Sequence, residues 1–481
     1  MGLSRKNTSN FKKNKTMEKT LVIGIIVLFI AAGLFFSCKQ IADQKTEEPE
    51  SFISEVVHPD WSKNVVLYEI NLRQFTEEGT IVAFEKHLPR LKELGVDVLW
   101  FMPVHPIGEK NRKEKLGSYY SVKDYKDINP EFGTLDDFKT MVSKAHEMGF
   151  FIMLDWVPNH SAWDNPLATD HPEFYMKDST GNFIPPIGTD WTDVIQFDWS
   201  QPGLHDYMVE ALSFWVELGV DGFRVDHPHK TPKEFWERVR PALEKIKPVL
   251  MLAENEEQTY FLEKGFDMNY AWELHHLMNS VAQGKDKVMS IDKYFKKEQK
   301  IYPDNVYRLR FITNHDENSW AGTIEERMGE AHKAFAVFIY TIPGVPLLYN
   351  GQEACLNKRL KFFERDPIEW KECELTGFYK SLNELKKNNM ALWNGASGGA
   401  MKRIKTTRDN RIFAFSREIE DNRVVVFINM SKKATKIRPA LENLKGNYED
   451  LFSKEKIQLP LNDSLFLDAW DYKVLVNPIL K

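Results

Sequence analysis

The feature that most constrains the fold is a repeated alternation of amphipathic helical segments and short apolar runs, which begins near Pro59. The segment "GTIVAFEKHLPRLKELG" has helical spacing and a glycine stop, and the apolar run "VDVLWFMPV" follows it. The same order returns in "GTLDDFKTMVSKAHEMG", where Thr134 and Asp137 form a capping signal, before "FFIMLD". Continuous apolar strands are typical of parallel sheets that are covered by helices, so an α/β fold is expected.

Eight apolar runs are predicted to be strands. They lie around Val65–Asn71, Val96–Pro103, Phe150–Asp155, Gly222–Asp226, Val249–Glu254, Phe266–Asn269, Tyr307–Thr313 and Val345–Tyr349. Eight strands separated by helices favour a closed (β/α)8 barrel, a TIM barrel, which we assign to residues 59–390. A doubly wound open sheet is the alternative, but the sequence lacks the glycine-rich phosphate loop that such sheets use.

Two regions depart from the repeat. Asp226 follows Asp155 by 71 positions, whereas one βα unit takes roughly 30 residues. The excess is rich in Pro, Gly, Asp and aromatic residues, so residues 160–203 are expected to form an inserted lobe over the open end of the barrel. Residues 391–481 show hairpin signals such as "RIFAFSREIEDNRVVVFINMS" and are expected to form an antiparallel β-sandwich.

Charge and composition restrict the partners. The net charge is −6 and no long basic block is present, which argues against a nucleic-acid partner. The 13 Trp residues are numerous for a chain of this length. Most are expected in the core, but a surplus of aromatic rings also suits stacking on the apolar faces of sugar rings.

Acidic residues end several of the predicted strands, at Asp155, Asp226, Glu254 and, after "FITNH", Asp316. Barrels of this type place their active sites at the carboxyl ends of the strands. Carboxylates that meet in a partly dry pocket repel one another, so their pKa values spread apart. Glycoside hydrolysis needs that spread, because one carboxylate acts ionised and another acts as an acid.

The stretch "GFRVDHPHK" places Arg224 and Asp226 on the same side of one strand, because side chains alternate along a strand. The guanidinium favours the charged form of the aspartate. A structural ion pair without catalytic importance is the alternative interpretation of this motif taken alone.

Four blocks in order, "DWVPNH", "GFRVD", the strand-end Glu254 and "FITNHD", resemble the signature blocks of the alpha-amylase superfamily, glycoside hydrolase family 13. The segments "YEINLRQF", "GSYYSVKDY", "NPEFGT" and "PGVPLLYNGQE" resemble its supporting motifs. The resemblance extends from about Val65 to about Trp370, and the C-terminal sandwich is similar to the usual last domain of that family.

The resemblance implies a retaining mechanism. It assigns Asp226 as the nucleophile and Glu254 as the acid and base, with the two carboxyl groups about 5–5.5 Å apart. It assigns Asp316 to the stabilisation of an oxocarbenium-like transition state. The substrate-binding residues that it implies are Tyr120 as a stacking platform, His160 and His315 as sugar ligands, Asp155 and Arg224 as orienting groups, and His229 and Lys230 in the cleft.

The sequence departs from the family pattern beyond the nucleophile. His229 and Lys230 reverse the order of a Lys-His pair that is common there, and His227 replaces a small residue. Asn159 matches a calcium ligand of the family, but Gln196 stands where a second ligand is an aspartate, with Asp198 nearby. Losing a carboxylate weakens a calcium site, so tight calcium binding is not expected. No organic cofactor is expected.

Two function classes remain open at this point. One is an enzyme that cleaves alpha-1,4-glucosidic bonds in starch-like alpha-glucans or maltooligosaccharides, with cyclomaltodextrinase and transglycosylase activities as close variants. The other is a catalytically inactive, membrane-anchored binding or interaction protein. The retention of all three acids favours the enzyme.

The N-terminus predicts export. Basic residues precede the apolar run Leu21–Phe36, whose 16 residues fall short of the roughly 20 of a spanning helix. The stretch "LFFSCK" resembles the lipidation box of bacterial lipoproteins, with Cys38 as the modified residue, so residues 1–38 are predicted to be a signal segment. An uncleaved anchor helix and a start at Met17 are alternatives.

Residues 39–58 are polar and acidic and are predicted to be a tether. The body is therefore expected outside the cytoplasm, attached to the membrane in the periplasm or at the cell surface. After Cys38 only Cys355 and Cys373 remain. In an exported protein these two cysteines could pair, and the sequence leaves this open.

Overall fold

The computed structural model describes residues 52–441, 444–461 and 464–477. The predicted signal segment 1–38, the lipidation site Cys38 and most of the predicted tether lie outside these residues and stay predictions. Within the described part of the chain, no helix combines the length and the apolar character that a membrane span requires.

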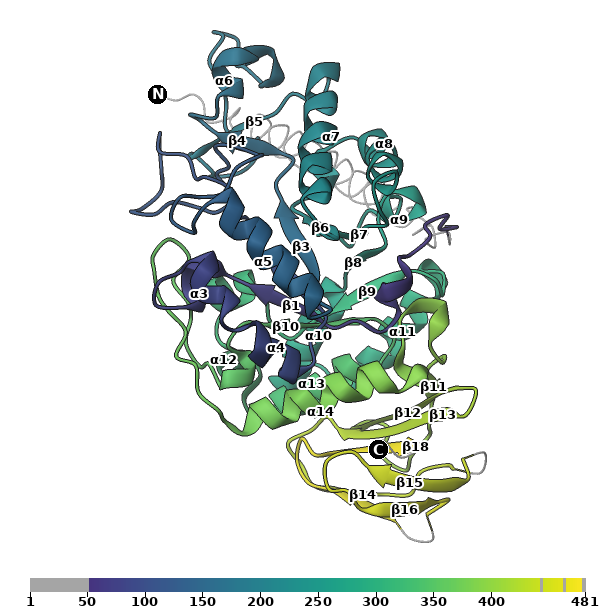
Figure 1. Ribbon diagram of the computed structural model, residues 1–481. Helices are drawn as coiled ribbons and strands as arrows, with labels where there is room; N and C mark the ends of the chain where they lie inside the picture. Colours follow the sequence, from purple (N-terminus) through teal and green to yellow (C-terminus); the bar gives the residue numbers. More distant parts are fainter. Residues whose placement is uncertain (1–51, 442–443, 462–463, 478–481) are drawn as a thin grey trace, which may run out of the picture. The chain divides into compact units, whose positions relative to one another are not determined.

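A closed barrel of eight parallel strands forms the larger part of the protein, as predicted (Figure 1). Around the barrel the order is β1-β10-β9-β8-β7-β6-β3-β2. All eight predicted strands are present, as β1 (Leu67–Ile70), β2 (Val98–Phe101), β3 (Phe151–Trp156), β6 (Gly222–Val225), β7 (Leu250–Ala253), β8 (Met268–Tyr270), β9 (Tyr307–Arg310) and β10 (Val345–Tyr349).

Helices follow the strands and cover the barrel. They are α2 (Leu72–Phe75), α3 (Ile81–Glu85), α4 (Leu88–Leu94), α5 (Leu135–Glu147), α6 (Leu167–Asp170), α7 (Pro202–Glu217), α8 (Lys233–Glu244), α9 (Phe261–Lys264), α10 (Trp272–Ala282), α11 (Val288–Ile301), α12 (Ile324–Met328), α13 (His332–Thr341) and α14 (Glu374–Asn388). The predicted capping box is present. The side chain of Thr134 accepts from the backbone N–H of Asp137, and the Asp137 carboxylate accepts from the backbone N–H of Thr134.

Side-chain alternation along each strand divides the core into two apolar layers. On β1, Tyr68 and Ile70 pack in the layer between strands and helices, while Leu67 belongs to the cluster inside the barrel. Glu69 therefore shares the inward side with Leu67. An acidic residue on the inward side of a buried strand is costly unless it has partners, which marks it as part of a polar site.

The connection after β3 forms the predicted inserted lobe. Its strands β4 (His160–Ala162) and β5 (Val194–Gln196) pair antiparallel, with His160 opposite Gln196. The short helix α6 lies between them in the chain. The lobe returns to the barrel through α7, so its residues are carried over the carboxyl ends of the strands.

The C-terminal region is antiparallel, as expected. A six-stranded sheet has the order β11-β12-β13-β18-β15-β16, and β14 pairs with β17 in a second, small sheet. The strands are β11 (Lys402–Arg403), β12 (Ile412–Ile419), β13 (Asn422–Asn429), β14 (Thr435–Ile437), β15 (Gly446–Asp450), β16 (Lys456–Leu459), β17 (Leu465–Leu467) and β18 (Tyr472–Asn477). An apolar cluster that includes Phe427, Ile437 and Leu467 fills the space between the two sheets.

Buried hydrogen bonds of Arg417 and Lys386 join this region to the barrel. From β12, the guanidinium of Arg417 donates to the carbonyl oxygens of Ile342 and Trp393 at 3.1 and 2.9 Å. From α14, Lys386 Nζ donates to the carbonyl oxygen of Gly344, directly before β10, at 2.9 Å and to Asn394 Oδ1 of the C-terminal region at 2.7 Å. The C-terminal sheet is thus fixed at the amino ends of the strands, away from the end where active sites lie.

The cysteine pairing left open by the sequence is resolved. Cys355 and Cys373 form a disulfide across 18 positions. It closes the segment between β10 and α14.

We expect reduction of this disulfide to lower the free energy of unfolding by about 2–4 kcal/mol, because the cross-link removes loop entropy from the unfolded chain. Urea unfolding of oxidised protein and of protein kept in excess dithiothreitol measures the difference. The same pair of conditions applied to a Cys355→Ala/Cys373→Ala variant controls for effects of the reductant. Coincident curves for the oxidised and reduced protein would contradict this expectation.

Candidate active site

A cavity of about 510 Å³ opens at the carboxyl ends of the barrel strands. Six of the residues predicted from the sequence line it, namely Tyr120, His160, Asp226, Glu254, His315 and Asp316. The lobe contributes Asp190, Trp191, Asp193 and Val194 to the wall, so the insertion shapes the cavity as expected. The three acids come from three different strand ends and meet at one mouth of the barrel.

Arg224 on β6 holds the acidic residues together. Its Nη1 lies 2.8 Å from Asp155 Oδ1 and 3.1 Å from Asp226 Oδ1. Its Nη2 lies 2.5 Å from Glu254 Oε1. Burial alone would lower the pKa of Arg224, but the surrounding acids outweigh it and keep the pKa well above its usual value. One planar cation therefore orients three carboxylates, a task for which the compact charge of a lysine is unsuited.

A close approach of β6 and β7 brings Asp226 and Glu254 to neighbouring positions. Gly222 pairs with Leu250 in the register of the two strands. A Cβ atom at Gly222 would collide with the carbonyl oxygen of Leu250. The glycine of "GFRVD" is therefore required by the packing of the strands that carry both acids.

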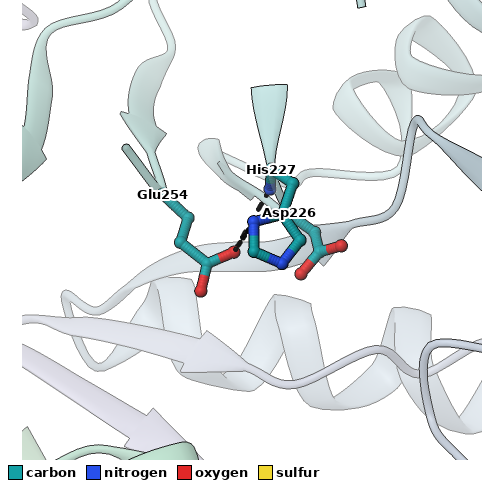
Figure 2. Close-up of side chains that lie close together, drawn as sticks. All are labelled: Asp226, His227 and Glu254. Atoms are coloured by element: carbon teal, nitrogen blue, oxygen red, sulfur yellow. Dashed lines mark hydrogen bonds and ion pairs between the residues drawn. The ribbon is translucent and has the colours of Figure 1, made fainter. Parts of the chain in front are cut away.

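His227 bonds to Glu254 at the mouth of the barrel, next to Asp226 (Figure 2). Its backbone is left-handed, with φ of 41°, and its N–H donates to Glu254 Oε2 at 3.2 Å. The Nδ1 atom of its ring lies 3.5 Å from the same oxygen. The ring itself stacks on that of Trp191 in the lobe, with ring centroids 5.6 Å apart. Burial opposes the charged imidazole, but Glu254 and Asp226 raise the pKa of His227 above its usual value.

A hydrogen-bonded chain supports the opposite wall. His315 Nδ1 bonds to the buried carboxylate of Glu69, and its Nε2 lies 2.8 Å from the Tyr120 hydroxyl. That hydroxyl donates to Asp155 Oδ2 at 3.1 Å. This order requires both nitrogens of His315 to donate. Burial would lower the pKa of His315, but Asp316 and Glu69 raise it to about 9, in agreement with a charged ring.

Asp155 lies behind Asp226, away from solvent. Burial raises the pKa of Asp155 to about 7, while Arg224 acts in the opposite direction. His160 differs from His315, because burial and the nearby His227 lower the pKa of His160 to about 4. The site thus places one charged and one neutral imidazole along the same cavity.

Five predicted site residues do not line the cavity: Asp155 and Arg224 lie behind it, Asn159 is buried, and His229 and Lys230 lie beyond the nucleophile. His229 and Lys230 belong to the short helix η3 (Pro228–Lys230) and do not line the cavity. The His229 ring lies 5.6 Å from that of His227, and burial and the charge of His227 lower the pKa of His229. The two residues whose order is reversed relative to the family pattern are thus also residues that do not line the cavity.

Sequence reasoning missed Glu69 and the wall residues Trp191, Trp320, Phe362 and Phe363. A signal for Glu69 was present, because an acid interrupts the apolar strand "LYEI". The aromatic residues lie in irregular connections, where no periodicity distinguishes a wall residue from a buried one.

The residues present do not provide a full donor set for calcium. Asn159 is buried, and its Oδ1 has no hydrogen-bond partner, which fits a ligand. Gln196 Oε1 instead accepts from the backbone N–H of Ile187, and Asp198 is bonded to Ser200. In the described ranges, Asp226, His227 and Glu254 are the one group of three His, Cys, Asp or Glu side chains spaced to hold a metal ion. No catalytic step is therefore assigned to calcium.

Comparisons with known proteins agree on the relationship. The family profile described as "Alpha amylase, catalytic domain" matches residues 46–184 and 187–399. "Alpha-amylase 3" of Dictyoglomus thermophilum is 26% identical, with 77% of this chain and 86% of that protein covered. Maltogenic alpha-amylase of Bacillus acidopullulyticus is 24% identical, with coverage of 87% and 78%.

Solved structures give the same result. The crystal structure of a noncanonic maltogenic alpha-amylase from Thermotoga neapolitana has a TM-score of 0.79 at 26% identity, covering 86% of this chain and 98% of that one. An alpha-amylase from Lactobacillus plantarum has a TM-score of 0.77 at 28% identity, with the same two coverages.

The raised pKa of His315 gives a prediction for stability. Because its folded pKa of about 9 exceeds the usual 6.5, the ion pair stabilises the fold fully below the usual value, and this contribution is lost as the pH rises through about 9. Each unit of pKa difference corresponds to about 1.4 kcal/mol. We expect urea unfolding to show a larger loss of stability between about pH 7 and about pH 10 in the wild type than in His315→Gln. Parallel losses would show that other groups carry the alkaline dependence.

Proposed function

The chain belongs to the alpha-amylase family of glycoside hydrolases, which act on alpha-glucans, and from this premise we propose that it cleaves alpha-1,4-glucosidic bonds with retention at the anomeric carbon. The observation that carries the proposal is the spacing of its two central acids. A carboxylate oxygen of Asp226 and one of Glu254 lie within 4.8 Å of each other. Retaining glycosidases hold their carboxyl groups about 5–5.5 Å apart, and inverting enzymes hold them about 6.5–9.5 Å apart.

The contacts suggest separate roles for the two acids. Arg224 engages Asp226 Oδ1, so we assign Oδ2 to the attack on the anomeric carbon. Arg224 contacts Glu254 Oε1, and Glu254 Oε2 accepts from the backbone N–H of His227. We therefore assign the proton that Glu254 transfers to its Oε2 atom. As the bond from Asp226 to the sugar forms, the glycosidic C–O bond breaks and its oxygen takes the proton of Glu254.

The second half of the reaction uses the same residues in reverse. Glu254, now ionised, takes a proton from water, which attacks the anomeric carbon and releases Asp226. Asp316 lies at the mouth, with its side chain 39% exposed, where it can bond sugar hydroxyls. The charged His315 and Asp155 fix the hydroxyl of Tyr120, so the aromatic ring of Tyr120 is held in place beside a sugar ring bound over Asp226.

The alternative of an inactive binding protein finds no support in the site. All three acids are present, and Arg224 contacts two of them, Asp226 and Glu254. An inactive barrel has no need to hold mutually repelling carboxylates in one cavity. Chain-length preference, cyclodextrin cleavage and transglycosylation depend on the loops, and the products formed from starch, maltotriose and cyclodextrin distinguish them.

Asp226→Asn should lower kcat on soluble starch by about 10³-fold or more, since an amide cannot form the covalent intermediate. The release of reducing ends measures this loss, and polarimetry of the wild-type products tests retention. Asp60→Asn, an exposed aspartate distant from the cavity, serves as the matched control and should keep full activity. Full activity of Asp226→Asn, or inverted products, would refute the assignment.

Glu254→Gln should lose much less activity on an aryl maltooligoside with a phenol of low pKa than on starch. Such a leaving group departs without a proton, so the step that needs the acid is bypassed. Steady-state rates on both substrates measure the difference. Equal losses on the two substrates would show that Glu254 does not serve as the acid.

We also propose that the protein is exported and attached to a membrane through lipidated Cys38. The basic residues before the apolar run and the stretch "LFFSCK" support this proposal. Labelling with a radioactive fatty acid should mark the wild type and spare Cys38→Ala. Equal labelling of both proteins, or of neither, would exclude this lipidation site.

A further inference from the structure

An exposed tryptophan lies in the cavity wall, four positions after Asp316. Trp320 is 57% exposed, and among the exposed large apolar residues of the described chain it alone lines the cavity. It belongs to a π-helical turn, Glu317–Ala321, that starts directly after Asp316. Single π-turns of this kind are frequent at functional sites. The same short element therefore carries Asp316 and an indole ring open to solvent.

Two phenylalanines extend this ring into a continuous surface. The Phe362 ring lies 5.3 Å from that of Trp320, and the Phe363 ring lies 6.1 Å from it. Phe362 is also nearly parallel to Tyr120, at 6.3 Å and 12°. We call Trp320, Phe362 and Phe363 the aromatic wall, and it continues from the ring of Tyr120 out to solvent.

The wall is held rigidly by groups that have no part in the chemistry. Arg73 Nη1 donates to the carbonyl oxygen of Phe362 at 3.3 Å, and Gln74 Nε2 donates to that of Glu364 at 2.7 Å. Arg73 and Gln74 are both fully buried. The role of the motif "YEINLRQF" is thereby explained in part, because its Arg and Gln fix the backbone on either side of Phe362 and Phe363.

The neighbouring turn and the disulfide complete this support. Ser319 Oγ donates to the carbonyl oxygen of Leu360 at 2.9 Å, which joins the two segments of the wall. The disulfide between Cys355 and Cys373 closes the segment that carries both phenylalanines. A surface that is fixed before binding loses little entropy when a ligand settles on it.

From this geometry we propose that the aromatic wall binds a further glucosyl residue of the substrate, beyond the ring held over Asp226 on its non-leaving side. The apolar face of a sugar ring stacks well on aromatic side chains. Glu254, which we assign to protonate the leaving oxygen, lies beside His227 and Trp191. The wall instead adjoins Tyr120 and Asp316, where the other end of the bound chain continues. This inference rests on the proposed function and adds to it a preference for longer chains.

Binding to an inactive enzyme tests the wall independently of catalysis. In the Glu254→Gln background, adding Trp320→Ala should raise the Kd of maltoheptaose by about tenfold, measured by titration calorimetry. Trp320→Tyr should restore most of the affinity, because it keeps a flat ring. Phe466→Ala, which removes an aromatic residue that is 55% exposed on β17 of the small C-terminal sheet, is the matched control and should bind as the parent does.

Phe363→Ala controls for the possibility that Trp320→Ala acts by displacing Asp316, because Phe363 lies on a different segment from that acid. It should weaken maltoheptaose binding in the same direction as Trp320→Ala. In the active enzyme, Trp320→Ala should raise KM for maltoheptaose and leave kcat/KM for 4-nitrophenyl α-glucoside within about twofold, because that substrate does not reach the wall.

Two outcomes would overturn the proposal. Unchanged affinity in both wall variants would show that the wall does not bind sugar, even if Asp226→Asn confirms the hydrolase. A loss confined to kcat, equal on both substrates, would show that Trp320 only positions Asp316.

Discussion

The structure of the site depends on one buried guanidinium. Arg224 is enclosed in the barrel, contacts Asp155, Asp226 and Glu254, and lies behind the cavity that these acids form. Three carboxylates so close together repel one another, and the fixed cation offsets this repulsion, while burial still raises the pKa of Asp155 to about 7. Because the guanidinium is planar and always charged, it also sets the directions in which Asp226 and Glu254 present their remaining oxygens.

The polar centre and the contacts that hold the C-terminal region lie at opposite ends of the barrel. At the amino end of β10, Arg417 and Lys386 join the C-terminal region to the barrel. The carboxyl ends carry long connections, and some of their residues, such as Tyr125, Ile195 and Phe197, belong to the apolar layer between strands and helices. The lobe supplies Trp191 on one side of the cavity, and the disulfide-closed segment supplies Phe362 on the other. The connections that shape the substrate cleft are therefore also anchored in the core.

Two of the three histidines that line the cavity, His160 and His315, show how position decides charge. His315 contacts Glu69 and Asp316, and these acids favour its protonated form in spite of burial. His160 is equally buried, but burial and the nearby His227 lower its pKa to about 4, so its ring stays neutral. The same residue type thus supplies two donors in one place and a donor with an acceptor in the other. Both rings matched the family pattern in the sequence, where nothing separates them.

The sequence by itself determined the barrel, its eight strands, the inserted lobe, the antiparallel C-terminal region and the three acids at the strand ends. These features follow from periodicity and from residues at fixed places in local motifs. Such patterns can be recognised in the sequence because they arise from short-range sterics and burial. Only the tertiary structure decided that Glu69 supports His315, that Cys355 pairs with Cys373, that Lys230 lies outside the cavity wall, and that Trp320 meets Phe362. Each of these depends on how irregular connections or distant strands meet in space, and no local pattern records such long-range contacts.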